Sequence, residues 1–402
     1  MPETKAHIVV AGTGPAGLIA ALGLAHAGFR VSLVGPDANA SDGRTTALMN
    51  PALAVLDRIG VLDELRVVAA PLKIMRIVDA TRRLIRSPVV TFRASEIDEE
   101  QFGLNFPNNV LNPVLAKAVE ASPEIEWRKS LVTSWSLEND TATAALADGT
   151  SVSGVLAVAA DGRSSPAREA AGIRTAARTY PQAALVLNFG HRVDHGFVST
   201  EFHTETGPCT QVPLPGNRSS LVWVVEPEMA DELAALDDAA LSIRVEERMQ
   251  SMLGRVSVEP GRQIYPLSAA TPLRFAAKRV ALVGEAAHVF PPIGAQGLNL
   301  GIRDIDDLID VALKNPNDPG SLSALAAYDF KRRPDILARS GAVNLLNMSL
   351  LSDMLPAQIA RGAGLGLLGG FAPLRAFFMR EGLRPGSGFA ALAGGLREQI
   401  RR

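Results

Sequence analysis

Three segments of this chain place a glycine-containing turn at the end of a predicted strand, and in two of them the turn leads into a predicted helix, an arrangement that binds anions. The most informative is 279–303, RVALVGEAAHVFPPIGAQGLNLGIR. It predicts a buried strand ending at Glu285, an irregular proline- and glycine-rich turn, and an amphipathic helix from Leu298 onward. A helix start leaves backbone N–H donors unsatisfied and carries partial positive charge. The segment is therefore suited to hold a phosphate, or an atom that becomes anionic during a reaction.

The second segment lies at the N-terminus. His7–Ala11 is a short apolar stretch, GTGPAG follows at 12–17, an apolar helix is predicted over Leu18–Ala27, and Arg30–Val34 supplies a second strand. A GxGxxG turn between a strand and a helix is the dinucleotide-binding fingerprint, because glycines permit the tight turn, close approach to a pyrophosphate and helix packing. The alternative is an ordinary glycine-rich turn.

One element departs from that fingerprint. An acidic residue is expected at the end of the second strand, where it binds the adenosine ribose. Gly35 stands there instead, and Asp37 is the nearby carboxylate. Asp37 is thus either the ribose ligand or a solvated turn residue.

The third segment is 155–168, VLAVAADGRSSPAR, a predicted buried strand that ends at Asp161 and Gly162 with Arg163 and Arg168 close by. Two strand ends, at Asp161 and Glu285, therefore place a carboxylate beside a glycine turn. A plain dehydrogenase does not show this pattern.

Together, GTGPAG, the Asp161–Gly162 segment and GEAAHVFPPIGAQGLNLG resemble the class A flavoprotein monooxygenases, the group that includes para-hydroxybenzoate hydroxylase. Three further stretches resemble the ubiquinone-biosynthesis hydroxylases: DGRTTAL at 42–48, FGLNFPNNVL at 102–111 and VPLPGNRSSLVW at 212–223. The resemblance covers about residues 5–385.

The resemblance implies a role for each matching position. The turn residues would bind the FAD pyrophosphate, largely through backbone amides: Gly12, Gly14, Pro15, Ala16 and Gly17. Arg44 would reach the flavin or its phosphates, Val132 would meet the adenine, Asp161 would contact both FAD and NAD(P)H, and Glu285 would bind the pyrophosphate or ribityl region. The isoalloxazine ring would be lined by Pro292, Gly294, Gln296, Gly297, Leu298 and Asn299.

The activity implied is an NAD(P)H-dependent FAD monooxygenase that hydroxylates the ring of a polyprenylated phenol in ubiquinone biosynthesis, using molecular oxygen through a flavin C4a-hydroperoxide. A helix start near Gln296 would stabilise the anionic reduced flavin. No catalytic base is identified. His288 is interpreted as a structural hydrogen-bonding residue rather than a catalytic one, and Tyr265 faces the ring pocket or packs within a strand. Three alternatives stay open: a hydroxylase of another aromatic compound, a flavin-dependent prenyl reductase, and a non-catalytic scaffold that binds flavin or a quinone intermediate.

Composition limits the class of protein. The formal net charge of −2 argues against a nucleic-acid partner. The one cysteine, Cys209, allows neither an intramolecular disulfide nor a thiolate metal site, and no metal is expected. The predicted fold starts at His7 and leaves no room for a signal peptide, so we expect a cytoplasmic protein.

The fold class expected is α/β, with two lobes because 402 residues exceed one core. A Rossmann-like, GR2-type FAD-binding domain would be discontinuous over 1–73, 107–178 and 273–340. A mainly antiparallel substrate-binding sheet would take 74–106 and 179–272, using strands at 74–77, 84–92, 184–189, 220–225 and 263–267, with one helix over Ala230–Met252. A C-terminal helical region would cover 341–402.

The C-terminal tail differs in charge from the rest of the chain. From Arg361 to Arg402 there are seven arginines and two glutamates among many apolar residues. Such a segment is suited to an anionic membrane surface on the inner face of the cell membrane, or to a partner in a quinone-biosynthesis assembly. The alternative is a helix packed on its own protein.

Overall fold

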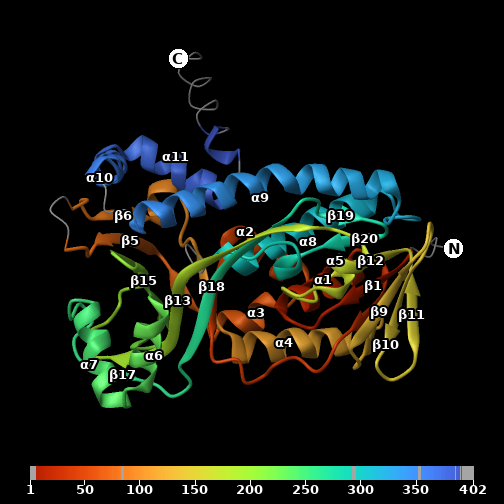
Figure 1. The fold of residues 1–402 in the computed structure, drawn as a ribbon, viewed down its shortest axis with the longest axis horizontal. Helices are drawn as coiled ribbons and strands as arrows, with labels where there is room; N and C mark the ends of the chain where they lie inside the picture. The colour runs from red at the N-terminus through yellow and green to blue at the C-terminus, as the bar shows by residue number, and fades with distance from the viewer. Residues whose placement is uncertain are drawn as a thin grey trace.

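The computed structural model describes residues 6–82, 86–291, 296–351, 355–384, 386–389 and 391. Within them, two large sheets are joined by two long strands, and helix α9 runs along one side of the whole molecule (Figure 1). The predicted α/β class is confirmed. The exact domain boundaries stay a prediction.

The first large sheet has six strands in the order β19-β20-β12-β1-β2-β8. All neighbours are parallel except β19 and β20. Its strands are nearly continuous apolar runs, as expected for a sheet covered on both faces. Their bounds are β1 His7–Ala11, β2 Arg30–Val34, β8 Ile125–Arg128, β12 Leu156–Ala159, β19 Ala276–Ala277 and β20 Val280–Leu282. The two N-terminal strands match the prediction residue for residue.

Helices cover this sheet and share one apolar core with it. The first follows the glycine turn and the eighth follows the proline–glycine turn, as the sequence predicts. Their bounds are α1 Pro15–His26, α2 Asn50–Arg58, α3 Leu62–Arg66, α4 Asn108–Ala121, α5 Pro166–Ala170, α8 Gln296–Lys314 and α9 Leu322–Leu351, with a short 3-10 turn, η2, at Gly284–Ala286.

Two three-stranded sheets flank the first one. The order β11-β10-β9 is built from β9 Val132–Leu137, β10 Ala142–Leu146 and β11 Ser151–Gly154. The order β3-β7-β4 is built from β3 Thr45–Met49, β7 Gly103–Pro107 and β4 Ala70–Leu72. The second of these lies between the two large sheets, since Asn105 of β7 donates to the Pro213 carbonyl at 2.8 Å.

The second large sheet has eight strands and is antiparallel apart from the pair β5 and β14. Its order is β17-β13-β16-β15-β14-β5-β6, and β18 also pairs with β13. The mainly antiparallel sheet expected from the sequence is confirmed, although residues 84 and 85 of the predicted strand 84–92 lie outside the described residues. The bounds are β5 Ile74–Asp79, β6 Val90–Arg93, β13 Thr175–His191, β14 Val198–Thr204, β15 Gly207–Leu214, β16 Arg218–Val225, β17 Val256–Val258 and β18 Gln263–Pro272.

The single helix predicted over Ala230–Met252 is wrong. The structure has two helices there, α6 Pro227–Ala235 and α7 Asp238–Arg248. Leu236 is extended, and the Asp237 carboxylate accepts the Ala240 amide at 2.7 Å, which caps a new helix. Both helices pack on the outer face of the second sheet in a separate apolar core that contains Cys209.

Two helices follow α9 in the described part of the chain. Helix α10, Leu355–Gly370, contacts β6, and helix α11, Ala372–Leu383, contacts the short 3-10 turn η1, Ala94–Ile97. Within the described residues no single helix is long and apolar enough to cross a membrane. One pair of segments, Gly362–Gly370 and Ala372–Leu383, passes that test only together, and it is bent by 103°.

Candidate functional site

The three turns singled out in the sequence lie side by side. A Cβ atom built on Gly12 would lie 2.2 Å from the Ala160 carbonyl oxygen, so the first turn touches the end of β12. A Cβ built on Gly284 would lie 2.9 Å from the Ala16 Cβ, so the first turn also touches the third. Segments more than 100 residues apart therefore surround one site.

The glycines of the first turn are required by this packing. Gly12 has φ +109°, a conformation that favours glycine. A Cβ on Gly17 would lie 1.9 Å from the Gly12 carbonyl oxygen. Gly14 directly precedes α1, and Pro15 and Ala16 are its first two residues, so this turn lies at the carboxyl end of β1, where ligands bind in such folds.

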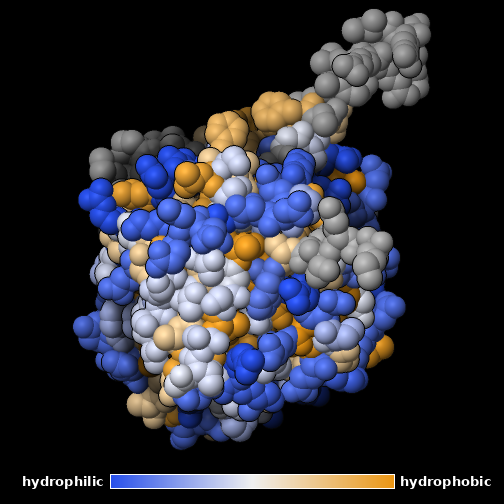
Figure 2. Space-filling model, turned by 90° about the vertical axis from the view of Figure 1, so that its right-hand side faces the viewer, coloured by the Kyte–Doolittle hydropathy of each residue, from blue (hydrophilic) through white to orange (hydrophobic). Residues whose placement is uncertain are grey.

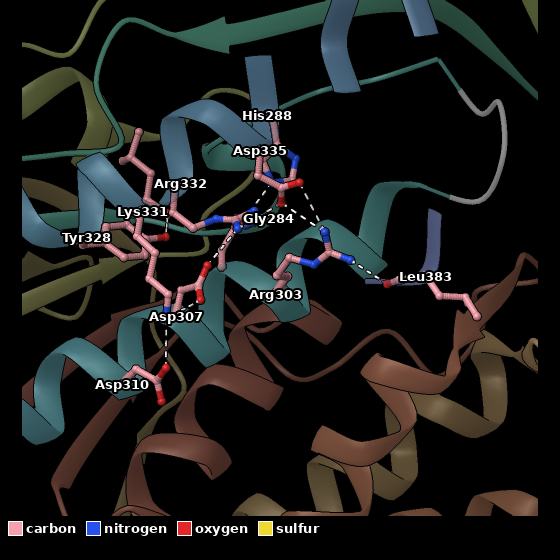
Figure 3. A network of polar contacts seen from close by, with 12 residues as sticks. Gly284, His288, Arg303, Asp307, Asp310, Tyr328, Lys331, Arg332, Asp335 and Leu383 are labelled. Carbon is pink, nitrogen blue, oxygen red and sulfur yellow. Dashed lines mark hydrogen bonds and ion pairs between the residues drawn. The ribbon is translucent and has the colours of Figure 1, made fainter. Parts of the chain in front are cut away.

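A buried carboxylate fixes the third turn. Asp304 of α8 is fully buried and accepts hydrogen bonds from the Gly284 amide at 3.1 Å, His288 Nε2 at 2.7 Å and Arg332 Nε at 2.8 Å. Figure 3 shows these contacts between the turn, α8 and α9. His288 is therefore a structural hydrogen-bonding residue, as the sequence suggested.

The network continues from Arg332. Its Nη1 donates to Asp307 at 2.8 Å and to Asp335 at 3.1 Å. Burial alone would lower the pKa of Arg332, but the carboxylates of Asp304, Asp335 and Asp307 raise it above its ordinary value. Arg303 joins Asp335 to the Leu383 carbonyl of α11, at 3.1 Å each, so the C-terminal helix is also connected (Figure 3).

Arg44 lies on the loop directly before β3. Its Nε and Nη2 donate to Asp42 at 2.8 and 2.7 Å, and Asn108 donates to the same carboxylate at 3.0 Å. Burial raises the pKa of Asp42, but the hydrogen bonds from Arg44 and Asn108 outweigh it and leave that pKa lowered. The Arg44 guanidinium lies 5.6 Å from the ring centre of Tyr265, which places Tyr265 on the side of the second sheet that faces the Arg44 loop.

The two strand-end carboxylates differ in environment. Asp161 Oδ2 accepts the Ala167 amide at 3.2 Å, whereas Oδ1 is buried without a partner in the part of the chain that is described. Burial raises the pKa of Asp161, with hydrogen bonds from Ser165 and Ala167 opposing it. Glu285 is half exposed and pairs with Arg163 at 3.2 Å. An unpartnered buried oxygen beside the glycine turn fits a hydroxyl donor of a bound ligand.

The helix that should line the ring begins at Gln296. Gly297 is exposed, Leu298 packs partly on the core, and the Asn299 side chain holds β3 by accepting the Met49 amide at 2.8 Å and donating to the Ala47 carbonyl at 2.7 Å. Pro292 and Gly294 lie outside the described residues. Val132 begins β9 and packs against the small apolar cluster that contains Val9 and Val34.

Another side chain occupies the position where an acidic ribose ligand is expected. A Cβ on Gly35 would lie 2.7 Å from Thr13 Cγ2 and 2.8 Å from Thr13 Oγ1, so the Thr13 side chain fills the place where an acidic side chain would begin. Asp37 is largely exposed and pairs with Lys129 at 2.7 Å. The structure thus brings Asp37 to a lysine at the surface, and its role as ribose ligand stays a prediction.

Comparison with known proteins identifies the family. The model of the FAD-binding domain family matches residues 5–338. Ubiquinone hydroxylase UbiL of Rhodospirillum rubrum is 32% identical over 391 residues, which cover 95% of this chain and 90% of that protein. The chain belongs to the FAD-binding family of flavoprotein monooxygenases that includes the ubiquinone hydroxylases.

Two further comparisons agree. The 3-demethoxyubiquinol 3-hydroxylase of Escherichia coli is 29% identical, with 91% of this chain and 95% of that protein covered. The crystal structure of p-nitrophenol 4-monooxygenase PnpA from Pseudomonas putida superposes with a TM-score of 0.74 at 23% identity, over 94% of this chain and 96% of that one, and shows the same fold. The predicted class, an FAD-dependent aromatic monooxygenase, is confirmed.

The residues present fit FAD. A Cβ on Gly14 would meet no atom within 4 Å, so open space lies beside the backbone of the turn, and Asp161 Oδ1 offers a free acceptor. Sequence reasoning missed Asp304, Arg332, Asp42 and Asn108. A signal existed for the first, because Asp304 falls at helical spacing between Leu300 and Leu308, within the buried stripe of α8.

We predict that Asp304→Asn destabilises the protein by about 3–5 kcal/mol, because it removes the charge that balances the buried Arg332. FAD binding should weaken at least ~10-fold, since the Gly284 turn loses its anchor. Chemical denaturation and flavin fluorescence measure the two effects. The control is Asp310→Asn. Asp310 lies on α8 like Asp304 but forms an exposed surface pair with Lys331 of α9, so its replacement should change neither the stability nor the FAD affinity. Equal values for both variants would contradict this role.

We predict that Gly35→Glu alone weakens FAD binding, because the new side chain collides with Thr13. Combining it with Thr13→Ala removes the two nearest colliding atoms and should recover part of the binding, while the φ of +157° at position 35 keeps the doubly substituted turn strained. Asp37→Asn should leave FAD affinity unchanged within about two-fold, which is under ~0.5 kcal/mol. Titration of the apoprotein with FAD measures all three. A large loss in Asp37→Asn would instead make Asp37 the ribose ligand.

Proposed function

We propose that this protein is an NAD(P)H-dependent FAD monooxygenase that hydroxylates the ring of a polyprenylated phenol in ubiquinone biosynthesis. The observation that carries the proposal is the meeting of three glycine turns opposite a broad antiparallel sheet. Near full-length similarity to two hydroxylases named for ubiquinone intermediates supports the substrate class.

The arrangement of the site indicates separate roles for the cofactor and for the protein groups around it. When bound, FAD takes electrons from the nicotinamide and carries out the oxygen transfer. The first turn would hold the pyrophosphate through backbone amides, and the positive end of α8 would stabilise the reduced, anionic flavin. Arg44, fixed by its ion pair with Asp42, would offer its remaining N–H donors to the cofactor. The second sheet would cover the site and exclude water, which strengthens these electrostatic interactions.

The test is the purified protein with FAD, assayed for NADH or NADPH oxidation with and without a prenylated phenol, and a deletion strain examined for accumulating quinone intermediates. We expect phenol-stimulated, oxygen-dependent oxidation and loss of ubiquinone in the strain. Normal ubiquinone would remove the pathway claim. Turnover without oxygen would favour the prenyl reductase. Tight FAD binding with no turnover, even with partner proteins, would favour the scaffold.

We further propose a cytoplasmic protein whose C-terminal helices meet the inner face of the membrane, where a polyprenylated substrate resides. Four large apolar side chains there are more than half exposed: Leu367, Phe371, Phe378 and Phe389. Figure 2 shows apolar side chains exposed along the top of this face of the molecule. Arg375 and Arg380 pair with Glu96 and Asp98, which orders α11 on the body of the protein.

We predict that the protein floats with anionic phospholipid vesicles and that the triple change Phe371→Ser, Phe378→Ser and Phe389→Ser reduces the bound fraction several-fold. Burying each phenyl ring in lipid is worth about 1.5–3 kcal/mol. Val67→Ser and Phe330→Ser, at exposed apolar positions away from the C-terminal helices, serve as controls. Equal flotation of both variants would refute the membrane proposal and leave a protein partner as the occupant.

A further inference from the structure

The second large sheet has two faces with different surroundings. Its outer face packs on α6 and α7. Its inner face contacts the segment that carries Asp42 and Arg44, because Thr45 donates to Ser220 of β16 at 2.9 Å and Asn188 of β13 donates to the Gly43 carbonyl at 2.9 Å. Side chains on this inner face are the ones that can meet a substrate held over the flavin.

Strand register places Glu201 on that inner face. Glu201 is opposite Thr210, Thr210 is opposite Val222, and Val222 lies two residues from Ser220 on the same strand. Directly opposed residues and residues two apart share one face of a sheet. Since neighbouring strands are about 4.8 Å apart, Glu201 lies roughly 10 Å from Val222, a span that one aromatic ring and its hydroxyl can bridge.

Glu201 forms a pair with His203. Glu201 Oε1 accepts His203 Nε2 at 2.8 Å, and the two side chains are 15% and 2% exposed. Thr210 Oγ1 approaches Glu201 Oε2 at only 3.4 Å, a weak contact that leaves this oxygen with acceptor capacity. His203 Nδ1 is buried and has no partner in the described part of the chain. A histidine that gives its one N–H to a carboxylate orients that carboxylate.

The surrounding inner face offers no other free carboxylate among the described strand residues. Asp79 lies opposite His203, but its oxygens accept the Thr81 amide and hydroxyl and the Ser87 amide, at 3.1, 2.6 and 2.8 Å. The nearest row positions are Thr210, Val222, Val186 and Ile77. Glu201 is thus a partly exposed carboxylate in an otherwise apolar or hydroxyl-bearing row.

We propose that Glu201 is a catalytic residue that accepts the proton of the substrate's ring hydroxyl, and that His203 is a positioning residue that holds it. This inference rests on the proposed function and adds the proton acceptor that the sequence did not identify. The substrate class is a phenol with a free hydroxyl, not an aryl ether.

As the ring carbon forms its bond to the oxygen that bound FAD would supply, the O–O bond to that oxygen would break and leave its electron pair on the cofactor. The phenol O–H bond breaks at the same time, its electron pair becomes part of a ring carbonyl, and the proton binds a Glu201 oxygen. The ring then loses its C–H proton to solvent, and the carbonyl oxygen takes the proton back from Glu201, so that the ring regains aromaticity and the carboxylate is restored. A carboxylate is a sufficient base, because the hydroxyl becomes strongly acidic as the ring loses electron density.

The test uses the FAD-loaded full chain with 2-geranylphenol and its methyl ether. We expect Glu201→Gln to lower kcat about 100-fold or more, a typical contribution of one general base. FAD affinity should not change. Binding by equilibrium dialysis should prefer the phenol to the ether in the unaltered protein, and Glu201→Gln should abolish that preference. Glu247→Gln, an exposed glutamate of α7 behind the sheet, should behave as the unaltered protein.

His203 is tested by a rescue pair. His203→Gln keeps an N–H donor near the Nε2 position and should retain most of kcat, whereas His203→Leu should lose at least ten-fold. The double variant Glu201→Gln with His203→Leu should be no slower than Glu201→Gln alone, since the two act as one unit.

Two results overturn the inference: Glu201→Gln within two-fold of the unaltered kcat, or an unchanged preference for phenol over ether. Failure of the proposed function is distinguishable, because the unaltered protein would then show no phenol-stimulated NAD(P)H oxidation. The dialysis measurement still decides whether Glu201 recognises the hydroxyl in that case.

Discussion

The whole cofactor-binding half depends on one buried carboxylate. Asp304 receives a backbone amide, an imidazole and a guanidinium, and each comes from a different segment: the Gly284 turn, the residues just after it, and α9. A buried charge is tolerated only when its partners are all in place. The arrangement therefore ties the order of the third turn to the packing of two helices, and through Arg303 to the last helix as well.

The sequence was most informative where short-range pattern and backbone sterics agree. Apolar runs bounded by glycine predicted β1 and β2 at their observed ends, and the three turns proved to be neighbours because only glycine permits the contacts at positions 12, 17 and 284. The pattern failed between α6 and α7. There, apolar spacing continues through the break, and the cap at Asp237 decides the boundary.

The polar partners were harder to predict for a different reason. Asp42, Asn108 and Arg44 belong to separate segments whose contact depends on how β3 meets α4. The Glu201–His203 pair carries no motif, and its place above the site follows only from register across β14, β15 and β16. A single sequence does not contain that register. Gly35 shows the opposite case, where a missing acid was visible in the sequence but its replacement by the Thr13 side chain was not.

The lone thiol gives this molecule a built-in reporter. Cys209 is fully buried on β15, and burial raises its pKa to about 12, so it is unreactive while the second sheet stays packed on α6 and α7. Alkylation of Cys209 can therefore proceed only during transient opening of that half. Flavin fluorescence reports on the other half. The rate of transient opening of each half can therefore be measured separately in the natural chain, without introducing a labelling site.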